Sequence, residues 1–184
     1  MQEKSNTARR SRWMLGMTLI ELLAAMAIAV ICLSLGIPSY RHVMERQRAD
    51  TAIHTLTSHL ASARATAITH NKITTVCPTD GIDPVCTTDG DWSRGWLMFL
   101  DPDGNNRPED TADILRNELA PLQGALSMRS STGRPQVRYL PDGRSAGSNL
   151  TIRVCLERDL MGEVVVNNMG RIRVARPSGK ACQP

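Results

Sequence analysis

Three arginines near the C-terminus, Arg171, Arg173 and Arg176, carry the clearest binding chemistry in this sequence. A guanidinium group is permanently charged and presents a planar fork of N–H donors that fits phosphate oxygens. In a β-strand, Arg171 and Arg173 would project from the same face, about 7 Å apart. Arg176 would fall on the opposite face, but Pro177 favours an extended or turning exit from the strand. We therefore expect the three arginines to converge on one phosphate-binding surface.

Basic residues are concentrated around this motif. Residues 129–184 carry 10 Lys or Arg against 4 Asp or Glu, whereas residues 17–128 carry 8 against 13. Ile172 and Val174 are expected to face the core and so to fix the strand. Three further basic residues are candidate contacts: Lys180, Arg134 and Arg138. The asymmetry of charge indicates a polyanionic partner, and a solvated strand face is the alternative.

A second chemically unusual residue, Glu21, is the one charge in the 21-residue stretch from Met17 to Ile37. As a helix this stretch would reach about 31 Å, which is enough to span the hydrocarbon core of a membrane. A carboxylate at the bilayer centre costs about 3 kcal/mol, so Glu21 requires a cationic partner. The basic residues that precede the stretch predict a cytoplasmic N-terminus and an exported C-terminus. A plain membrane anchor with an incidental glutamate is the alternative.

The order of the leader differs from that of a secretory signal, because the apolar segment follows the expected cut after Gly16 and is retained. The run Gly16-Met17-Thr18-Leu19-Ile20-Glu21 resembles the prepilin leader and N-terminal helix of type IV pilins and type II secretion pseudopilins. The family usually has Phe where this chain has Met17. The resemblance implies cleavage by a prepilin peptidase between Gly16 and Met17, with N-methylation afterwards. The new α-amine of Met17 on a neighbouring subunit is then a candidate partner for Glu21.

Beyond the apolar segment, residues 38–71 are predicted to form the amphipathic helix of a stem. Pro38 is expected to kink or interrupt the helix, and Asn71 to stop it. Apolar residues recur at intervals of three and four and are expected to pack on a sheet: Ala49, Ala52, Ile53, Leu56, Leu60, Ala63 and Ala67. Polar residues are expected to stay in solvent: Arg46, Arg48, Asp50 and Arg64. Four histidines without metal-ligand spacing are interpreted as surface groups: His42, His54, His59 and His70.

From residue 72 to 184 the sequence changes to short apolar runs separated by turns. The predicted strands are Ile73–Cys77, Gly95–Leu100, Ala125–Met128, Gln136–Leu140, Leu150–Leu156, Glu163–Val166 and Arg171–Val174. Asp101, Asp103 and Asn105 favour a hairpin turn over a calcium site, because the spacing of an EF-hand loop is not met. Three aromatic residues are expected to pack in the sheet rather than to stack on a ligand: Trp92, Trp96 and Phe99. The expected fold class is α+β, with one long helix and a mainly antiparallel sheet.

Several segments in this region resemble the GspH/FimT family of minor pilins and pseudopilins. They are Asp91-Trp92-Ser93-Arg94-Gly95-Trp96, Phe99-Leu100-Asp101-Pro102-Asp103-Gly104 and Leu140-Pro141-Asp142-Gly143-Arg144. The resemblance implies a pilin-like fold in four parts. These are a leader (1–16), a transmembrane helix (17–37), an amphipathic helix (38–71) and a β-rich globular head outside the cytoplasm (72–184).

Five cysteines are present, and Cys32 lies within the apolar segment as a small filler. The other four lie in the head, where an even number in an exported domain suggests disulfides. Three pairings are possible, and we favour Cys77–Cys86 and Cys155–Cys182. The first would close a short loop, and the second would tie the C-terminal tail to a strand. Free buried thiols are the alternative.

The pattern Gly170-Arg171-x-Arg173-x-x-Arg176 resembles the DNA-binding signature of FimT-type minor pilins that serve natural transformation. The resemblance implies a minor type IV pilin that binds extracellular DNA through the phosphate backbone, independently of sequence. Aromatic residues do not interleave with the arginines, so base stacking is not expected. With three or four phosphates engaged, affinity should fall roughly 40- to 150-fold between 50 and 200 mM salt.

The alternative function is purely structural, as a pilus-priming subunit or type II secretion pseudopilin without DNA contact. The sequence has no P-loop and no His-Glu-x-x-His motif, and we predict neither an enzyme nor a cofactor. The expected partners are other pilin subunits, a prepilin peptidase, DNA and the bacterial inner membrane. The head is expected in the periplasm, and at the cell surface once a pilus has assembled.

Overall fold

A computed structural model of the chain describes residues 17–119, 126–177 and 179–182, with the backbone alone at 35–39 and 41–42. The predicted leader, including Gly16, lies outside the described residues. The chain divides into two compact units, 1–41 and 42–184.

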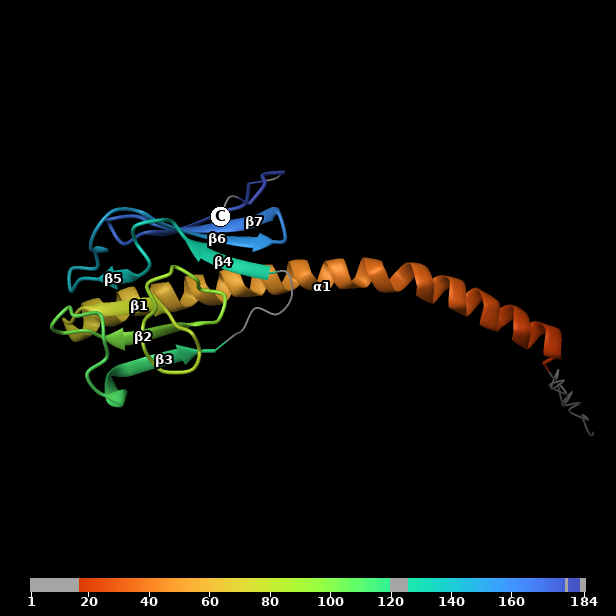
Figure 1. Cartoon of the computed structure of the whole chain (residues 1–184), viewed down its shortest axis with the longest axis horizontal. Helices are drawn as coiled ribbons and strands as arrows, with labels where there is room; N and C mark the ends of the chain where they lie inside the picture. Colours follow the sequence, from red (N-terminus) through yellow and green to blue (C-terminus); the bar gives the residue numbers. More distant parts are fainter. Residues whose placement is uncertain (1–16, 120–125, 178, 183–184) are drawn as a thin grey trace, which may run out of the picture. The chain divides into compact units, whose positions relative to one another are not determined.

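A single helix, α1 (Leu19–His70), accounts for 52 residues (Figure 1). Its first turn is capped by Thr18, whose hydroxyl oxygen accepts a hydrogen bond from the Glu21 backbone N–H at 3.3 Å. The helix runs through Pro38 without a break, so of the two predicted effects, a kink or an interruption, the interruption is wrong. It ends as predicted at Asn71, which has a left-handed φ of 53°, while the Lys72 N–H bonds back to the Ala67 carbonyl.

Within the first unit, the side chains described from residue 17 to residue 34 are all exposed. Ten of them are large and apolar: Met17, Leu19, Ile20, Leu22, Leu23, Met26, Ile28, Val30, Ile31 and Leu33. In the described part of the chain, a helix both long enough and apolar enough to cross a membrane is not found.

The second unit contains two four-stranded antiparallel sheets rather than the one sheet that was expected (Figure 1). Sheet A has the order β3 (Ile114–Glu118), β2 (Trp96–Leu100), β1 (Thr74–Pro78) and β5 (Val137–Tyr139). Sheet B has the order β4 (Leu126–Ser130), β6 (Leu150–Leu156), β7 (Asp159–Val166) and β8 (Ile172–Ala175). The seven predicted strands are present with small shifts of their ends. Strand β3 and the short 3-10 helix η1 (Thr111–Asp113) were not predicted.

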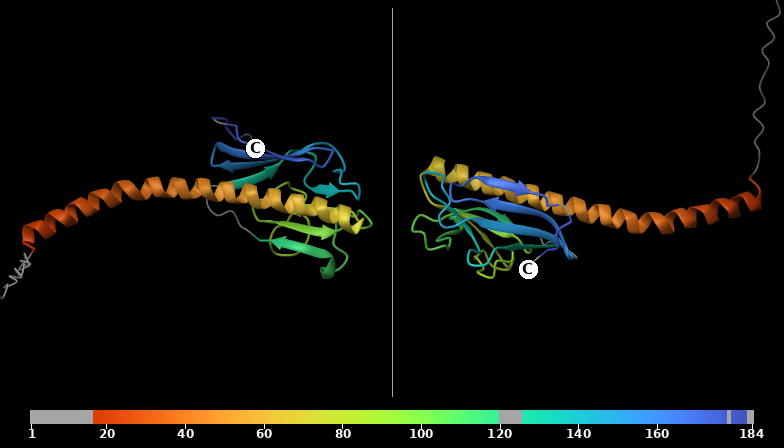
Figure 2. Two further views of the ribbon diagram at one scale, coloured as in Figure 1. Left: turned by 180° about the vertical axis from the view of Figure 1, so that it is seen from behind. Right: turned by 90° about the horizontal axis from the view of Figure 1, so that it is seen from above.

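The C-terminal part of α1 lies across both sheets (Figure 2). The predicted apolar face of the helix is buried, and it forms one core with the inner faces of the two sheets. Trp92 and Trp96 belong to this core, as predicted. The inner-facing residues of sheet A include Val76 and Met98, and those of sheet B include Ile152 and Val164. One helix therefore holds the two sheets together.

Two polar residues of α1 are more closely involved in packing than the sequence indicated. His59 was interpreted as a surface group, but its Nδ1 accepts a hydrogen bond from the buried Trp96 Nε1 at 3.0 Å. Arg64 was expected to stay in solvent, but its Nε donates to the Gly143 carbonyl at 2.9 Å, and its Nη2 donates to the Met169 carbonyl at 3.3 Å. Both differences arise from segments distant in the chain: strand β2 brings Trp96 to His59, and two loops bring Gly143 and Met169 to Arg64.

Disulfide bonds join Cys77 to Cys86 and Cys155 to Cys182, which are the two favoured pairings. Their Cα–Cα distances are 5.5 and 5.9 Å. The first bond closes a loop beside Leu97 and Phe99, which form a small second core with Cys77 on the outer face of sheet A. The second bond ties the C-terminal tail to strand β6 of sheet B.

Candidate nucleic-acid interface

Strand β8, which carries the arginine motif, is an edge strand of sheet B. A hairpin joins it to β7, with the Asn167 N–H bonded to the Arg171 carbonyl and the Gly170 N–H bonded to the Asn167 carbonyl. Gly170 has a φ of +74°, and any Cβ there would collide with the Gly143 carbonyl oxygen. Glycine is therefore required at the position that begins the motif. Arg64 supports the same turn through its hydrogen bond to the Met169 carbonyl.

Arg173 projects from the outer face of sheet B, and Arg171 directly precedes β8; both side chains are exposed. Arg173 lies opposite Val165 on β7, while Ile172 lies opposite the buried Val166 and packs on the core. Val174, expected to face the core, is 38% exposed. It lies on the inner side, but the edge position leaves it without a neighbouring strand to cover it. Within the described residues, neither Arg171 nor Arg173 forms an ion pair.

Arg176 does not join the other two arginines. Its Nη2 lies 3.1 Å from the Asp50 Oδ1 and 3.5 Å from the His54 Nε2, both on α1. Alternation along the strand places Arg176 on the helix side, and Pro177 does not bring it back to the outer face. The predicted convergence of the three arginines is therefore wrong.

Lys180 lies in a tail that the sheet holds in place. The Leu160 N–H donates to the Lys180 carbonyl at 3.1 Å, and the Cys182 N–H donates to the Arg158 carbonyl at 2.7 Å. The Lys180 side chain is exposed and lines a hollow of about 460 Å³ together with Arg46 and Arg176. The tail is thus ordered by backbone contacts as well as by the Cys155–Cys182 bond.

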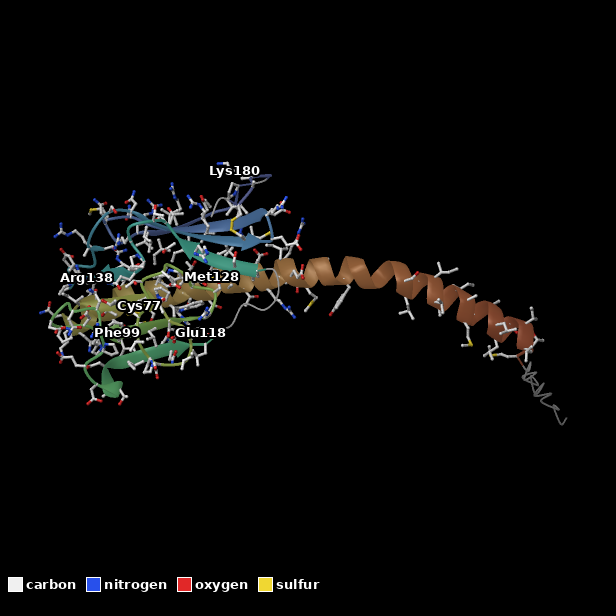
Figure 3. All side chains as sticks on the ribbon, viewed as in Figure 1. Cys77, Phe99, Glu118, Met128, Arg138 and Lys180 are labelled. Carbon is white, nitrogen blue, oxygen red and sulfur yellow. A yellow bond between two sulfur atoms is a disulfide. The ribbon has the colours of Figure 1, made fainter. Side chains whose placement is uncertain are left out.

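Arg134 and Arg138, the other predicted contacts, line one hollow together. Figure 3 shows Arg138 and Lys180 at different places in the head. Arg134 donates from Nη2 to the Ser145 hydroxyl at 2.6 Å and from Nη1 to the Ser148 carbonyl. Its partial burial lowers the pKa of its guanidinium group. Arg138 donates to the Gly104 carbonyl at 3.2 Å. Both arginines stabilise loops, and both line a hollow of about 310 Å³ at the β5 edge of sheet A.

Two further arginines on the outer face of sheet B were not singled out from the sequence. Arg129 on β4 lies directly opposite Arg153 on β6. The Arg153 Nε lies 3.2 Å from the Glu163 Oε1 on β7. Alternation in the predicted strand Leu150–Leu156 could have placed Arg153 on the outer face. The pairing with Arg129 depends on strand order, which the sequence does not show.

The segment Gly143-Arg144-Ser145-Ala146-Gly147 has the Gly-x-Ser-x-Gly spacing of a hydrolase nucleophile, which sequence reasoning overlooked. In a hydrolase this serine sits exposed on a sharp strand-to-helix turn. Here the segment lies in the loops after β5, and Ser145 is 3% exposed, with its hydroxyl accepting from Arg134. The geometry is that of a structural loop.

The aspartates of the 101–106 turn are bonded to protein donors. Asp101 is buried and accepts from the Thr75 hydroxyl at 2.8 Å and from the Asn106 N–H at 3.3 Å. Asp103 accepts from the side chain and backbone of Asn105. Among the described residues, no cluster of His, Cys, Asp or Glu is arranged to hold a metal ion. These contacts favour the hairpin-turn interpretation.

A long helix packed on antiparallel sheets is the fold of a pilin-like subunit. Residues 52–170 match the family described as Type II transport protein GspH, and the chain belongs to this family. The match ends at Gly170, directly before the first arginine of the motif. A comparison with curated protein sequences gives no match.

Solved structures of two minor subunits are similar to this chain. The type IV minor pilin FimU of Pseudomonas aeruginosa (crystal form P21) is 17% identical, with a TM-score of 0.58 and coverage of 76% of this chain and 96% of FimU. A second FimU crystal form (P65) gives a TM-score of 0.54 at 17% identity, covering 73% and 97%. The minor pseudopilin EpsH of the Vibrio cholerae Type 2 Secretion System has 15% identity and a TM-score of 0.49, covering 71% and 98%.

Family membership makes this chain a minor pilin or pseudopilin, which associates with other pilin subunits at a membrane or in a pilus. It is a structural subunit rather than an enzyme. The expected α+β pilin-like fold class is confirmed.

Proposed function

We propose that this chain is a minor type IV pilin that binds extracellular DNA through Arg171 and Arg173 for uptake in natural transformation. The observation that carries the proposal is that both arginines are exposed, Arg173 on the outer face of the edge strand β8 and Arg171 directly before it. The two residues are separated by one position, a spacing of about 7 Å in extended backbone, which is close enough for the two side chains to contact neighbouring phosphates. Lys180 adds a third exposed cation in the tail.

The binding is expected to be led by phosphates and independent of base sequence. The large aromatic side chains Trp92, Trp96 and Phe99 are buried in the head, so they do not offer a stacking platform. Contacts from arginine to phosphate oxygens carry no sequence information of their own. Arginines that neutralise phosphates release the counterions of the DNA, so the affinity depends strongly on the salt concentration.

The N-terminal part of the proposal concerns processing and membrane insertion. A prepilin peptidase cuts between Gly16 and Met17, and the retained helix anchors the subunit in the inner membrane with its head in the periplasm. The exposed apolar side chains of residues 17–34 support this part, because water does not favour such a surface. Glu21 pairs with the Met17 amine of a neighbouring subunit during assembly. A mature chain that still began at Met1 would contradict this part of the proposal.

A purely structural role, in pilus priming or type II secretion, is the second candidate. The contact of Arg176 with Asp50 favours it, because this arginine of the motif is used inside the subunit. The two candidates differ in whether Arg171 and Arg173 have a ligand.

The test measures binding of a fluorescent DNA duplex to the full chain in nonionic detergent, from 50 to 300 mM salt. We expect Arg171→Gln/Arg173→Gln to reduce the slope of log affinity against log salt by about 1.8, and to weaken binding roughly 60-fold at 0.1 M salt. The matched control is Arg107→Gln/Arg116→Gln, which removes the same charge from exposed positions outside sheet B. Equal affinities for the two double variants would favour the structural role.

A further inference from the structure

Arg129 and Arg153 form a concentration of positive charge outside the arginine motif. They occupy directly opposed positions on β4 and β6, so both belong to the outer face of sheet B. Like charges at opposed positions repel each other, and Glu163 beside Arg153 offsets only one of them. Arg129 is exposed and has no ion-pair partner among the residues that the structure describes. This arrangement favours an anion that contacts both arginines.

Hollows lie on both sides of this arginine pair. One of about 250 Å³ extends toward the Cys155–Cys182 disulfide, and one of about 550 Å³ extends toward the loop 131–135. Both are lined by Arg129, Ser130 and Arg153, so they adjoin at the arginine pair. The larger hollow shares Gly133 and Pro135 with the hollow that Arg134 and Arg138 line. We call this row of three adjoining hollows the β4 groove.

The wall of the β4 groove is fixed by backbone hydrogen bonds. The Trp92 N–H donates to the Met128 carbonyl at 2.9 Å, and the Ser130 N–H donates to the Gly90 carbonyl at 2.9 Å. These bonds pair the segment 90–92 with β4 and occupy backbone hydrogen-bonding groups on the free edge of that strand. The arginines therefore stand on a rigid base, which lowers the entropy lost when they bind a ligand.

The remaining lining of the larger hollow is polar and rich in hydroxyls: Thr88, Ser130, Ser131 and Thr132. Hydroxyl groups donate to phosphate oxygens and so suit the same ligand as the arginines. Asp89 also lines this hollow, but its Oδ1 already accepts from the Thr87 hydroxyl and from the Asp91 N–H, each at 3.0 Å. The groove therefore has four arginines in its three parts. Its acidic lining residues are Asp89, which is engaged, and Glu157 in the smallest hollow.

We propose that the β4 groove binds a phosphodiester backbone, with Arg129 and Arg153 as its central contacts. This inference rests on the proposed function and adds a second contact surface to it. Three strand spacings, about 14 Å, separate β4 from β8, so Arg129 and Arg173 reach different phosphates. The contributions of the two surfaces to the salt dependence of binding are therefore additive.

The test uses the full chain in nonionic detergent with the same DNA duplex and salt range. We expect Arg129→Gln to lower the salt slope by about 0.9 and to weaken binding about eightfold at 0.1 M salt. Arg116→Gln is the control, because it removes the same charge from an exposed position on β3 of sheet A. Asp89→Asn is expected to tighten binding about twofold, because it removes a like charge from beside the ligand. Arg129→Lys, which keeps the charge, is expected to retain the slope.

The outcomes separate this inference from the proposed function. An Arg129→Gln variant that binds like Arg116→Gln would overturn the β4 groove, whatever the double variant of Arg171 and Arg173 shows. Loss of binding in Arg129→Gln alone would uphold the groove while refuting the role of the motif. A sulfated polysaccharide serves as a competitor at the same concentration of negative charge as the duplex. If it displaced the duplex, and if Arg129→Gln weakened its binding as much as that of DNA, the assignment to phosphodiesters would be overturned.

Discussion

Sheet A and sheet B have the same number of strands and share one helix, yet their outer faces are used differently. The outer face of sheet A carries Leu97 and Phe99, which are buried beside the disulfide of Cys77. The outer face of sheet B carries Arg129 and Arg173, which are exposed. The inner faces of the two sheets therefore define the fold, while the covering of each outer face decides whether that sheet offers an exposed surface.

The largest expected difference between the sheets is in how much the free energy of unfolding falls when a side chain on the outer face is truncated. Phe99→Ala should lower the free energy of unfolding by about 4 kcal/mol, because it leaves a cavity in the second core. Val165→Ala, on the outer face of sheet B beside Arg173, should cost about 1 kcal/mol or less, since this residue is half-buried. Urea unfolding of the two variants measures both. Equal costs would mean that the outer face of sheet B is packed as tightly as that of sheet A.

Removing each disulfide in turn should also affect the two sheets differently. Loss of Cys77–Cys86 should cost about 2.7 kcal/mol and loss of Cys155–Cys182 about 3.6 kcal/mol, by the entropy of the loops that they close. Paired Cys→Ser variants can be followed by thermal unfolding and by DNA binding. The second variant should also bind DNA more weakly, because the tail with Lys180 is released. A weaker affinity in the first variant alone would reverse the assignment of the faces.

The smallest expected effect is a pH dependence at the helix contact with sheet A. Burial lowers the pKa of His59, whose ring nitrogen accepts from Trp96, although the charge of Glu118 opposes the shift. The unfolded chain therefore binds the proton more readily. The stability that His59 contributes is complete above about pH 6.5 and is lost as the pH falls through its lowered pKa.

Urea unfolding at pH 7.5 and pH 5.0 measures this dependence. His59→Gln should unfold with less difference between the two pH values than the parent chain, because glutamine has an uncharged acceptor at every pH. His70, exposed at the end of α1, provides the control substitution His70→Gln. An unchanged pH dependence in His59→Gln would exclude this histidine as the source.

Much of the fold could be predicted because it depends on local periodicity. The helix face from Ala49 to Ala67 follows a repeat of three and four residues, and the alternation in Leu150–Leu156 identifies a buried strand. Strand β3 was missed because most of its side chains are exposed, so its sequence lacks an apolar alternation. Strand β3 is extended because it pairs with β2.

The candidate site was predicted less completely. The outward direction of Arg173 follows from alternation along one strand, and it agrees with the structure. Arg171 precedes the strand and is exposed. The partner of Arg176 lies on α1, more than a hundred residues away in the chain, and a local pattern does not contain it. The opposition of Arg129 and Arg153 likewise requires knowledge of which strands are neighbours.

By itself, the sequence determined the helix and most strands, and its motifs led to the family. These properties are set by the spacing of residues near one another in the chain. The tertiary structure decided that there are two sheets, that Arg176 turns to the helix and that a groove follows β4. Those outcomes depend on packing between distant segments, whose relative energies no short stretch of sequence contains.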